Sequence, residues 1–230
     1  MKNIFERLEN KIGLKFKDTG LLRNIFIHRS YLNENRHVKL ISNEKLEFLG
    51  DSVLSLITSV YLYKKFPYLE EGEYTEIKSS IVRTESLTEA AANLNLGDYL
   101  LLSKGQDQEG GRKNKNILAD CFEALIGGIF IDLGFEKAYY FVTKFLFAKK
   151  LDYIINNKLY LSPKSHLQEF TQSRYRVTPV YNIIEERGPE HERIFRVAVF
   201  VNKKRLALAS GKSKKEAEEK AAKIALEKLT

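Results

Sequence analysis

The sequence predicts a mainly helical N-terminal domain followed by a small α+β domain. Up to about residue 148, apolar residues recur at helical spacing and strand-like alternation is scarce. From residue 162 onward, one helix is followed by three alternating stretches and a second helix. The charge changes too: from Tyr160 onward there are 15 Lys and Arg against 9 Asp and Glu, and before it 23 against 21. The expected parts are residues 1–150, a connector at 151–161, and residues 162–230.

Glycine and proline residues divide the helical part. We expect breaks at Gly20, Pro67, Gly72 and Gly97, and a loop over residues 104–116. This loop reads KGQDQEGGRKNKN, with three glycines and four basic residues. A mobile solvated loop and a contact to a phosphate backbone are equally good interpretations of it.

The segment Asn43–Leu54, NEKLEFLGDSVL, predicts a helix with an acidic face. Glu44, Glu47 and Asp51 fall at positions i, i+3 and i+7, which share one side of a helix. An apolar stripe that includes Leu46 and Val53 interleaves with them. Stacked like charges destabilise a helix, and burial increases that cost. A solvated acidic face explains this segment taken alone.

A second segment, Ile117–Asp132, is almost wholly apolar apart from its acids and predicts a buried helix. Asp120 and Glu123 are spaced i and i+3, so they emerge on one face. Acidic side chains are rarely buried unless they are paired or bind a metal. A partner such as Arg29 or Arg83 is the alternative to a metal. We expect Cys121, between them, to be a small buried hydrophobe.

Together the two segments offer four carboxylates, Glu47, Asp51, Asp120 and Glu123. Oxygen ligands favour Mg²⁺, with Mn²⁺ as a substitute, whereas zinc prefers His and Cys. The chain has one Cys and four His, so a zinc site is not expected. Mg²⁺ held by carboxylates suits phosphoryl transfer. The pattern does not separate one catalytic metal ion from two.

The C-terminal part predicts the order helix–strand–strand–strand–helix. Ser162-Pro163 is a good helix start. The three alternating stretches are Val180–Arg187, Ile194–Asn202 and Leu206–Ser210. Ser213 and Glu216 have the spacing of a capping box that opens the last helix. Because the net charge of +8 is concentrated here, we expect this domain to bind a polyanion.

Composition excludes some classes of protein. No apolar run approaches the length of about 18 residues that a membrane span needs, so we expect no membrane partner. The amphipathic, charged N-terminus does not resemble a secretory signal. A single cysteine rules out an internal disulfide and fits a reducing cytoplasm.

The motifs resemble a known family. NEKLEFLGDSVL and ADCFEALIGG look like the two acidic motifs of bacterial ribonuclease III, and HRS at residues 28–30 and EEGEYT at residues 70–75 also fit. The order of parts is similar as well: a nuclease domain followed by a double-stranded-RNA-binding domain. The resemblance implies a Mg²⁺-dependent endoribonuclease that cuts double-stranded RNA to 5′-phosphate and 3′-hydroxyl ends. It also implies processing of precursor ribosomal RNA and other structured transcripts.

The resemblance also assigns roles to residues. It implies that Glu47, Asp51, Asp120 and Glu123 are the metal ligands. It implies supporting catalytic roles for Glu44, acting across a dimer interface, and for Glu71 near the cleavage centre. It further implies a homodimer with Phe48 at the subunit contact, in which each subunit cuts one strand.

Recognition of A-form RNA needs polar groups for 2′-hydroxyls and cations for phosphates. Ser165, Gln168 and Glu169 share one face of the first C-terminal helix, and His191 lies in the loop GPEHER, where it could enter a minor groove. Near the last helix, the phosphate-contact candidates are Lys212, Lys214 and Lys215.

Two other functions remain open on the sequence. The chain could bind duplex RNA without cutting it, and the acids would then be structural. It could also be a metal-dependent nucleotide phosphohydrolase, although such helical enzymes often use a His-Asp pair, which is missing here. Incubation of duplex RNA with Mg²⁺ separates these functions from a nuclease.

Overall fold

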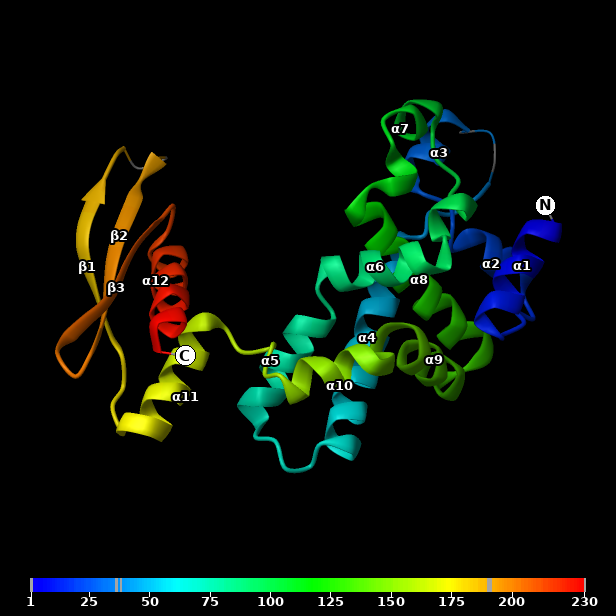
Figure 1. Cartoon of the computed structure of the whole chain (residues 1–230). Helices are drawn as coiled ribbons and strands as arrows, with labels where there is room; N and C mark the ends of the chain where they lie inside the picture. Colours follow the sequence, from blue (N-terminus) through cyan, green and yellow to red (C-terminus); the bar gives the residue numbers. More distant parts are fainter. Residues whose placement is uncertain (1, 36, 38, 190–191, 230) are drawn as a thin grey trace. The chain divides into compact units, whose positions relative to one another are not determined.

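The structure is a computed structural model that describes residues 2–35, 37, 39–189 and 192–229. The chain forms two compact units, Met1–Asn157 and Lys158–Thr230 (Figure 1). The first unit is helical and the second contains the three-stranded sheet. This arrangement confirms the predicted fold class.

The first unit is built around α8 (Lys115–Leu133), which packs against α4 (Glu44–Lys65), α6 (Thr84–Leu94) and α9 (Phe135–Val142). Its apolar residues are buried almost all round, as the sequence predicts for this helix. The remaining α-helices are α1 (Lys2–Ile12), α2 (Thr19–Asn24), α3 (Arg29–Glu34), α5 (Glu71–Ile81), α7 (Lys104–Gln108) and α10 (Ala148–Asn156). Short 3₁₀ turns lie at Leu96–Tyr99 and Gly111–Lys113, and a π-helical turn lies at Thr143–Phe147.

Two predicted breaks are wrong in position. Gly20 and Gly72 are each the second residue of a helix, α2 and α5. The chain turns just before them, because the side chain of Asp18 caps α2 and Glu70 forms a capping box with Glu73 at α5. A glycine in the first helical turn therefore does not mark a break here.

The segment 104–116 is folded rather than an open loop, because it contains α7 and the second 3₁₀ turn. Arg112 organises this segment. Its guanidinium forms two hydrogen bonds with Asp107, at 2.8 and 3.0 Å, and donates to the carbonyl oxygens of Gly97 and Leu100. This network contradicts the prediction of a mobile loop, and it occupies one of the four cations considered for a phosphate contact.

Helix α10 extends into the segment that the sequence assigns to the connector. It ends at Asn156, and Leu151 within it is fully buried in the first unit. Burial of an apolar residue at this position stabilises the helix against the unit.

The second unit follows the predicted order: α11 (Pro163–Tyr175), β1 (Val180–Arg187), β2 (Ile194–Val201), β3 (Lys204–Gly211) and α12 (Lys214–Leu229). The strands are antiparallel in the order β1-β2-β3. Both helices pack on one face of the sheet, where Leu167, Val199 and Ala222 belong to a common core. The alternation in the three strands therefore predicted the buried and exposed faces of a real sheet.

Helix α4 is also long and apolar enough to cross a membrane, when only length and composition are considered among the described residues. The core helix of a globular domain passes the same test. Here 39% of the apolar window is buried inside the protein, and α4 packs along α8. The observation is thus weak evidence for a membrane role.

Candidate functional site

Two helix-interior glycines determine how closely α4 and α8 approach. A Cβ atom added at Gly50 would lie 1.8 Å from the carbonyl oxygen of Glu123, and one at Gly127 would lie 2.2 Å from that of Leu46. Both distances are far below a van der Waals contact, so the two backbones touch directly. A glycine inside a helix costs about 1 kcal/mol relative to alanine, so it usually has a packing reason. Both glycines are visible in the sequence, but the spacing of the acids does not indicate that they mark a helix crossing.

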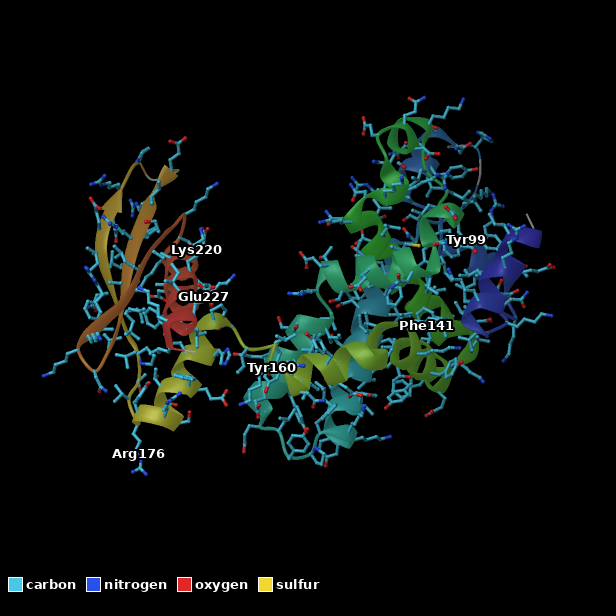
Figure 2. The ribbon with its side chains drawn as sticks, in the orientation of Figure 1. Tyr99, Phe141, Tyr160, Arg176, Lys220 and Glu227 are labelled. Atoms are coloured by element: carbon cyan, nitrogen blue, oxygen red, sulfur yellow. The ribbon has the colours of Figure 1, made fainter. Side chains whose placement is uncertain are left out.

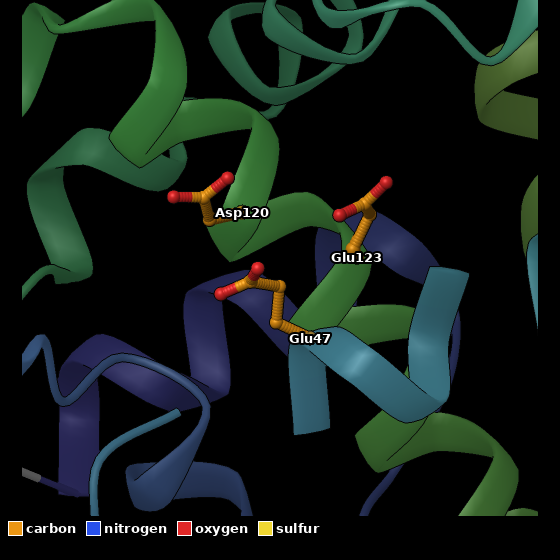
Figure 3. A group of neighbouring side chains, drawn as sticks. All are labelled: Glu47, Asp120 and Glu123. Carbon is orange, nitrogen blue, oxygen red and sulfur yellow. The ribbon is translucent and has the colours of Figure 1, made fainter. Parts of the chain in front are cut away.

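The close crossing gathers three carboxylates in one space. Glu47 on α4 and Asp120 and Glu123 on α8 each offer an oxygen within 4.8 Å of the other two (Figure 3). Glu47 and Asp51 are one turn apart on α4, as are Asp120 and Glu123 on α8. The two acidic helices therefore converge as the sequence predicts, and three of the four proposed ligands meet.

Burial makes this group of acids electrostatically costly. It raises the pKa of Glu123 to about 8, and the charges of Asp51, Glu47 and Asp120 act in the same direction. Burial is also the main cause that raises the pKa of Glu47 and of Asp120. The protein thus places three carboxyl groups where burial and neighbouring negative charges disfavour their ionised forms.

The acids fit a hard divalent cation. Among the described residues, none of the three forms an ion pair with Lys or Arg. Arg29 contacts Glu44 at 3.7 Å and Arg83 contacts Glu85 at 3.9 Å, so neither proposed arginine partner neutralises the cluster. Mg²⁺ binds oxygen at about 2.1 Å, so ligands on opposite sides are about 4.2 Å apart. Adjacent ligands in the octahedron are about 3.0 Å apart, so side-chain rotations would bring the three oxygens into the coordination shell of one ion.

The other predicted catalytic acids lie outside the group of three. Asp51 is exposed but close enough for its charge to raise the pKa of Glu123. Glu44 is at the first residue of α4, where it accepts a hydrogen bond from Ser42. Glu71 begins α5, which packs near the C-terminal end of α4, where Tyr74 donates to the carbonyl of Phe66. Within one chain, Glu47 lies near the start of α4, about 27 Å of helix from its C-terminal end.

The sequence assigned no structural role to several residues that support the site. Asn43 is buried, donates to the carbonyl of Ile25 at 3.2 Å, and so fixes the start of α4. His28 lies near Asp120 and Glu44, and its Nδ1 is 2.8 Å from Oγ of Ser30. The Oγ of Ser30 in turn accepts from the backbone of Ser103. These contacts join three segments that are distant in the sequence, which no local pattern shows.

Cys121 is fully buried and free between Asp120 and Phe122. Burial raises the pKa of its thiol well above the ordinary range. The residue therefore behaves as the small hydrophobe that the sequence predicts, and not as a nucleophile or metal ligand.

In the second unit, the predicted phosphate contacts lie around the start of α12. Lys214 and Lys215 are its first two residues, and Lys212 precedes it; all three are exposed. Ser213 Oγ accepts from the amide of Glu216 at 3.2 Å, as expected of a capping residue. The Glu216 carboxylate accepts from the amide of Lys212 at 2.7 Å, one residue before the expected partner.

The predicted sugar contacts lie on α11. Gln168 is exposed, and Ser165 is half-buried beside the capping residue Ser162. Glu169 is exposed but forms an ion pair with Lys158, so in this conformation its carboxylate is engaged. His191 lies outside the described residues.

Comparison with known proteins gives two matches to protein families. The family described as Ribonuclease-III-like matches residues 18–150, and the double-stranded RNA binding motif matches residues 163–229. Proteins named Ribonuclease 3 from Syntrophobacter fumaroxidans and Chloroflexus aurantiacus are 43% and 44% identical to this chain. These alignments cover 96% and 98% of this chain and 93% and 92% of those proteins.

Solved structures agree with this result. The nuclease domain of ribonuclease III from Campylobacter jejuni is 38% identical over 64% of this chain and 95% of that one, with a TM-score of 0.58. A helical domain with an acidic site, joined to an RNA-binding α-β-β-β-α domain, defines an endoribonuclease that acts on double-stranded RNA. The chain belongs to the ribonuclease III family.

Proposed function

We propose that this endoribonuclease depends on Mg²⁺, or on Mn²⁺ as a substitute, held by Glu47, Asp120 and Glu123 with Asp51 beside them. The convergence of three carboxylates from α4 and α8 within 4.8 Å carries this proposal. When bound, the ion supplies polarisation of the scissile phosphate and a more acidic water. The side chains orient that ion, and the ion in turn relieves their mutual repulsion.

We further propose that the products carry 5′-phosphate and 3′-hydroxyl ends, and that the substrates include precursors of ribosomal RNA with messenger and transfer RNA precursors. The single cysteine, buried and free, is compatible with the cytoplasm. Support for the substrate class comes from the match of residues 163–229 to the double-stranded RNA binding motif.

Long duplex RNA incubated with the protein and Mg²⁺ is expected to be cut into short duplexes. Addition of a chelator, or replacement of Mg²⁺ by Ca²⁺, should stop the reaction, because catalysis needs a small ion with strict octahedral geometry. Gel electrophoresis with single-stranded RNA and duplex DNA as controls measures this. Intact duplex RNA after long incubation would support the alternative, a protein that binds without cutting.

We propose that the enzyme is a homodimer that uses an exposed apolar stripe on α4. Phe48, Leu56 and Tyr63 are 77%, 53% and 74% exposed. Spacings of eight and seven residues place them on one side of the helix. Apolar patches of this kind mark contact surfaces. A solved Campylobacter jejuni ribonuclease III nuclease domain is described as having a flexible region involved in dimer formation. In a dimer, Glu44 and Glu71 could complete the site of the other subunit.

Phe48→Asp is expected to convert the dimer to a monomer, because a charge would then have to be buried in the contact. Phe48 has little contact with its own unit, so the fold should be retained. Light scattering coupled to size exclusion measures the mass. Tyr153→Asp, at a residue 61% exposed on α10, is the matched control and should leave the mass unchanged. A monomeric wild type would remove the basis for this proposal.

Lys214→Ala and Lys215→Ala are each expected to weaken binding to every duplex and to lower the slope of log affinity against log salt by about one. The reason is that each lysine releases counterions from the phosphate it contacts. Lys223→Ala, which removes an exposed charge farther along α12, should change neither value much. Binding is measured by fluorescence anisotropy in Ca²⁺ at several salt concentrations. An unchanged slope would remove that lysine from the contacts.

A further inference from the structure

A groove lies on the sheet of the second unit, away from the predicted RNA contacts. It has a volume of about 530 Å³, and its walls include Val177, Val180 and Phe200, with Asn202 and Lys203 at the turn that joins β2 to β3. Val180 is 56% exposed, which is high for a valine in a strand. The groove therefore presents apolar surface to solvent.

The strand register shows which side of the sheet carries this groove. Tyr181 pairs with Val199. Val199 belongs to the core beneath α11 and α12, and Tyr181 packs against that core. Val180 pairs with Phe200 one position along. Because successive side chains point to opposite faces of a strand, Val180 and Phe200 lie on the face that the helices do not cover. A duplex held by α11 and the start of α12 would leave this face free.

The charge around the groove has one sign. Residues 174–183 and 198–210, the two segments that contain all the lining residues of the groove, have no Asp or Glu. Of their five cations, Lys203 lines the groove, and Arg174, Arg176, Lys204 and Arg205 are neighbours of lining residues in the sequence. Across the described part of the chain, no ion pair involves any of these five. Figure 2 shows the side chain of Arg176 extending away from the ribbon.

We propose that this groove binds an acidic peptide segment of a partner protein, with one bulky apolar side chain of the peptide seated between Val180 and Phe200. Burial of that side chain covers the exposed valine, and the flanking carboxylates meet the unpaired cations. A second copy of the chain fits less well, because like charges would face each other around the groove. RNA fits less well too, because phosphates and riboses gain nothing from an aliphatic wall.

The test uses the full chain and a fluorescein-labelled peptide, Asp-Glu-Asp-Phe-Glu-Leu-Asp-Glu. Anisotropy should show saturable binding that is weakened about tenfold or more by Val180→Asp and by Lys203→Glu. Val180→Leu, which keeps the apolar wall, and Lys223→Glu, which makes the same charge change on α12, should bind as the wild type does. Duplex RNA affinity measured in Ca²⁺ should be the same for Val180→Asp as for the wild type, which shows that the unit is still folded.

A second measurement locates the contact. When the peptide phenylalanine is replaced by benzoylphenylalanine, photo-crosslinks should map to residues 177–182 and 200–205. Equal binding of a peptide with Ser in place of Phe would show a purely electrostatic contact and overturn the proposal. So would crosslinks elsewhere, displacement of the peptide by a short RNA duplex, or no binding at all.

Discussion

Replacement of Glu123 by Gln is expected to reduce cleavage of double-stranded RNA by about a thousandfold or more, with RNA affinity unchanged. Glu123 is one of the three gathered acids and is the most strongly perturbed of them, because burial and its acidic neighbours raise its pKa to about 8. Glutamine keeps the shape but loses the charge that attracts a cation. Loss of metal-ion stabilisation of several kcal/mol corresponds to a rate loss of that size.

In the Glu123→Gln variant, the effects on folding and on metal affinity can be measured separately from the effect on cleavage. The folded-state pKa of Glu123, about 8, is above its ordinary value of 4.5, so the folded chain holds the proton more tightly than the unfolded chain does. The resulting stability is fully present below pH 4.5 and is lost as the pH rises through 8. Gln carries no such charge, so above pH 8 the metal-free variant should melt at a higher temperature than the metal-free wild type.

Divalent ions should reverse the order of the two melting temperatures, so that the wild type melts above Glu123→Gln. Mg²⁺ or Ca²⁺ should raise the melting temperature of the wild type at pH 8, because a ligand that binds only the folded state stabilises it. The rise should be much smaller for Glu123→Gln. Glu136→Gln, at an exposed acid in the first turn of α9, is the matched control and should cleave and melt as the wild type does. A Glu123→Gln enzyme with normal activity would show that the metal assignment is wrong.

Among the glycine-to-alanine changes in the first unit, Gly50→Ala is expected to have the largest effect on stability. The new Cβ would lie 1.8 Å from the carbonyl oxygen of Glu123, and that backbone atom cannot move without α8. The helices must separate or the variant must unfold. Overpacking in a dense core costs about 1–3 kcal/mol and occasionally more, and a backbone clash is at the upper end. Thermal melting by circular dichroism measures this loss.

If Gly50→Ala still folds, a second effect, on its stabilisation by Mg²⁺, can be measured. Separation of α4 from α8 would spread Glu47 away from Asp120 and Glu123, so the stabilisation by Mg²⁺ should fall together with the melting temperature. Gly72→Ala is the matched control: a Cβ added there would meet no neighbouring atom within 4 Å, and alanine favours the helix α5. It should melt at the same temperature as the wild type or slightly higher. Equal melting of Gly50→Ala and wild type would contradict the close crossing.

The local patterns were enough for the elements of the second unit. The strand β1 begins and ends at the predicted residues, and β2 differs by one residue at its end. The alternation of apolar and polar residues predicts these strands correctly because helices bury one face of the sheet and leave the other open. Glycine positions were less informative in the first unit, since Gly20 and Gly72 start helices while Gly50 and Gly127 lie at a crossing. The physical role of a glycine depends on which neighbouring atoms the absence of a side chain allows to approach.

The sequence alone determined the acidic character of two helices, the order of the two domains and the concentration of positive charge in the second. These properties follow from composition and spacing along one chain. Only the tertiary structure decided that Glu47, Asp120 and Glu123 meet, that the charge of Asp51 acts on Glu123, and that Arg112 is a structural residue. Such contacts join residues far apart in sequence, and they depend on backbone approach at Gly50 and Gly127, which no periodicity encodes.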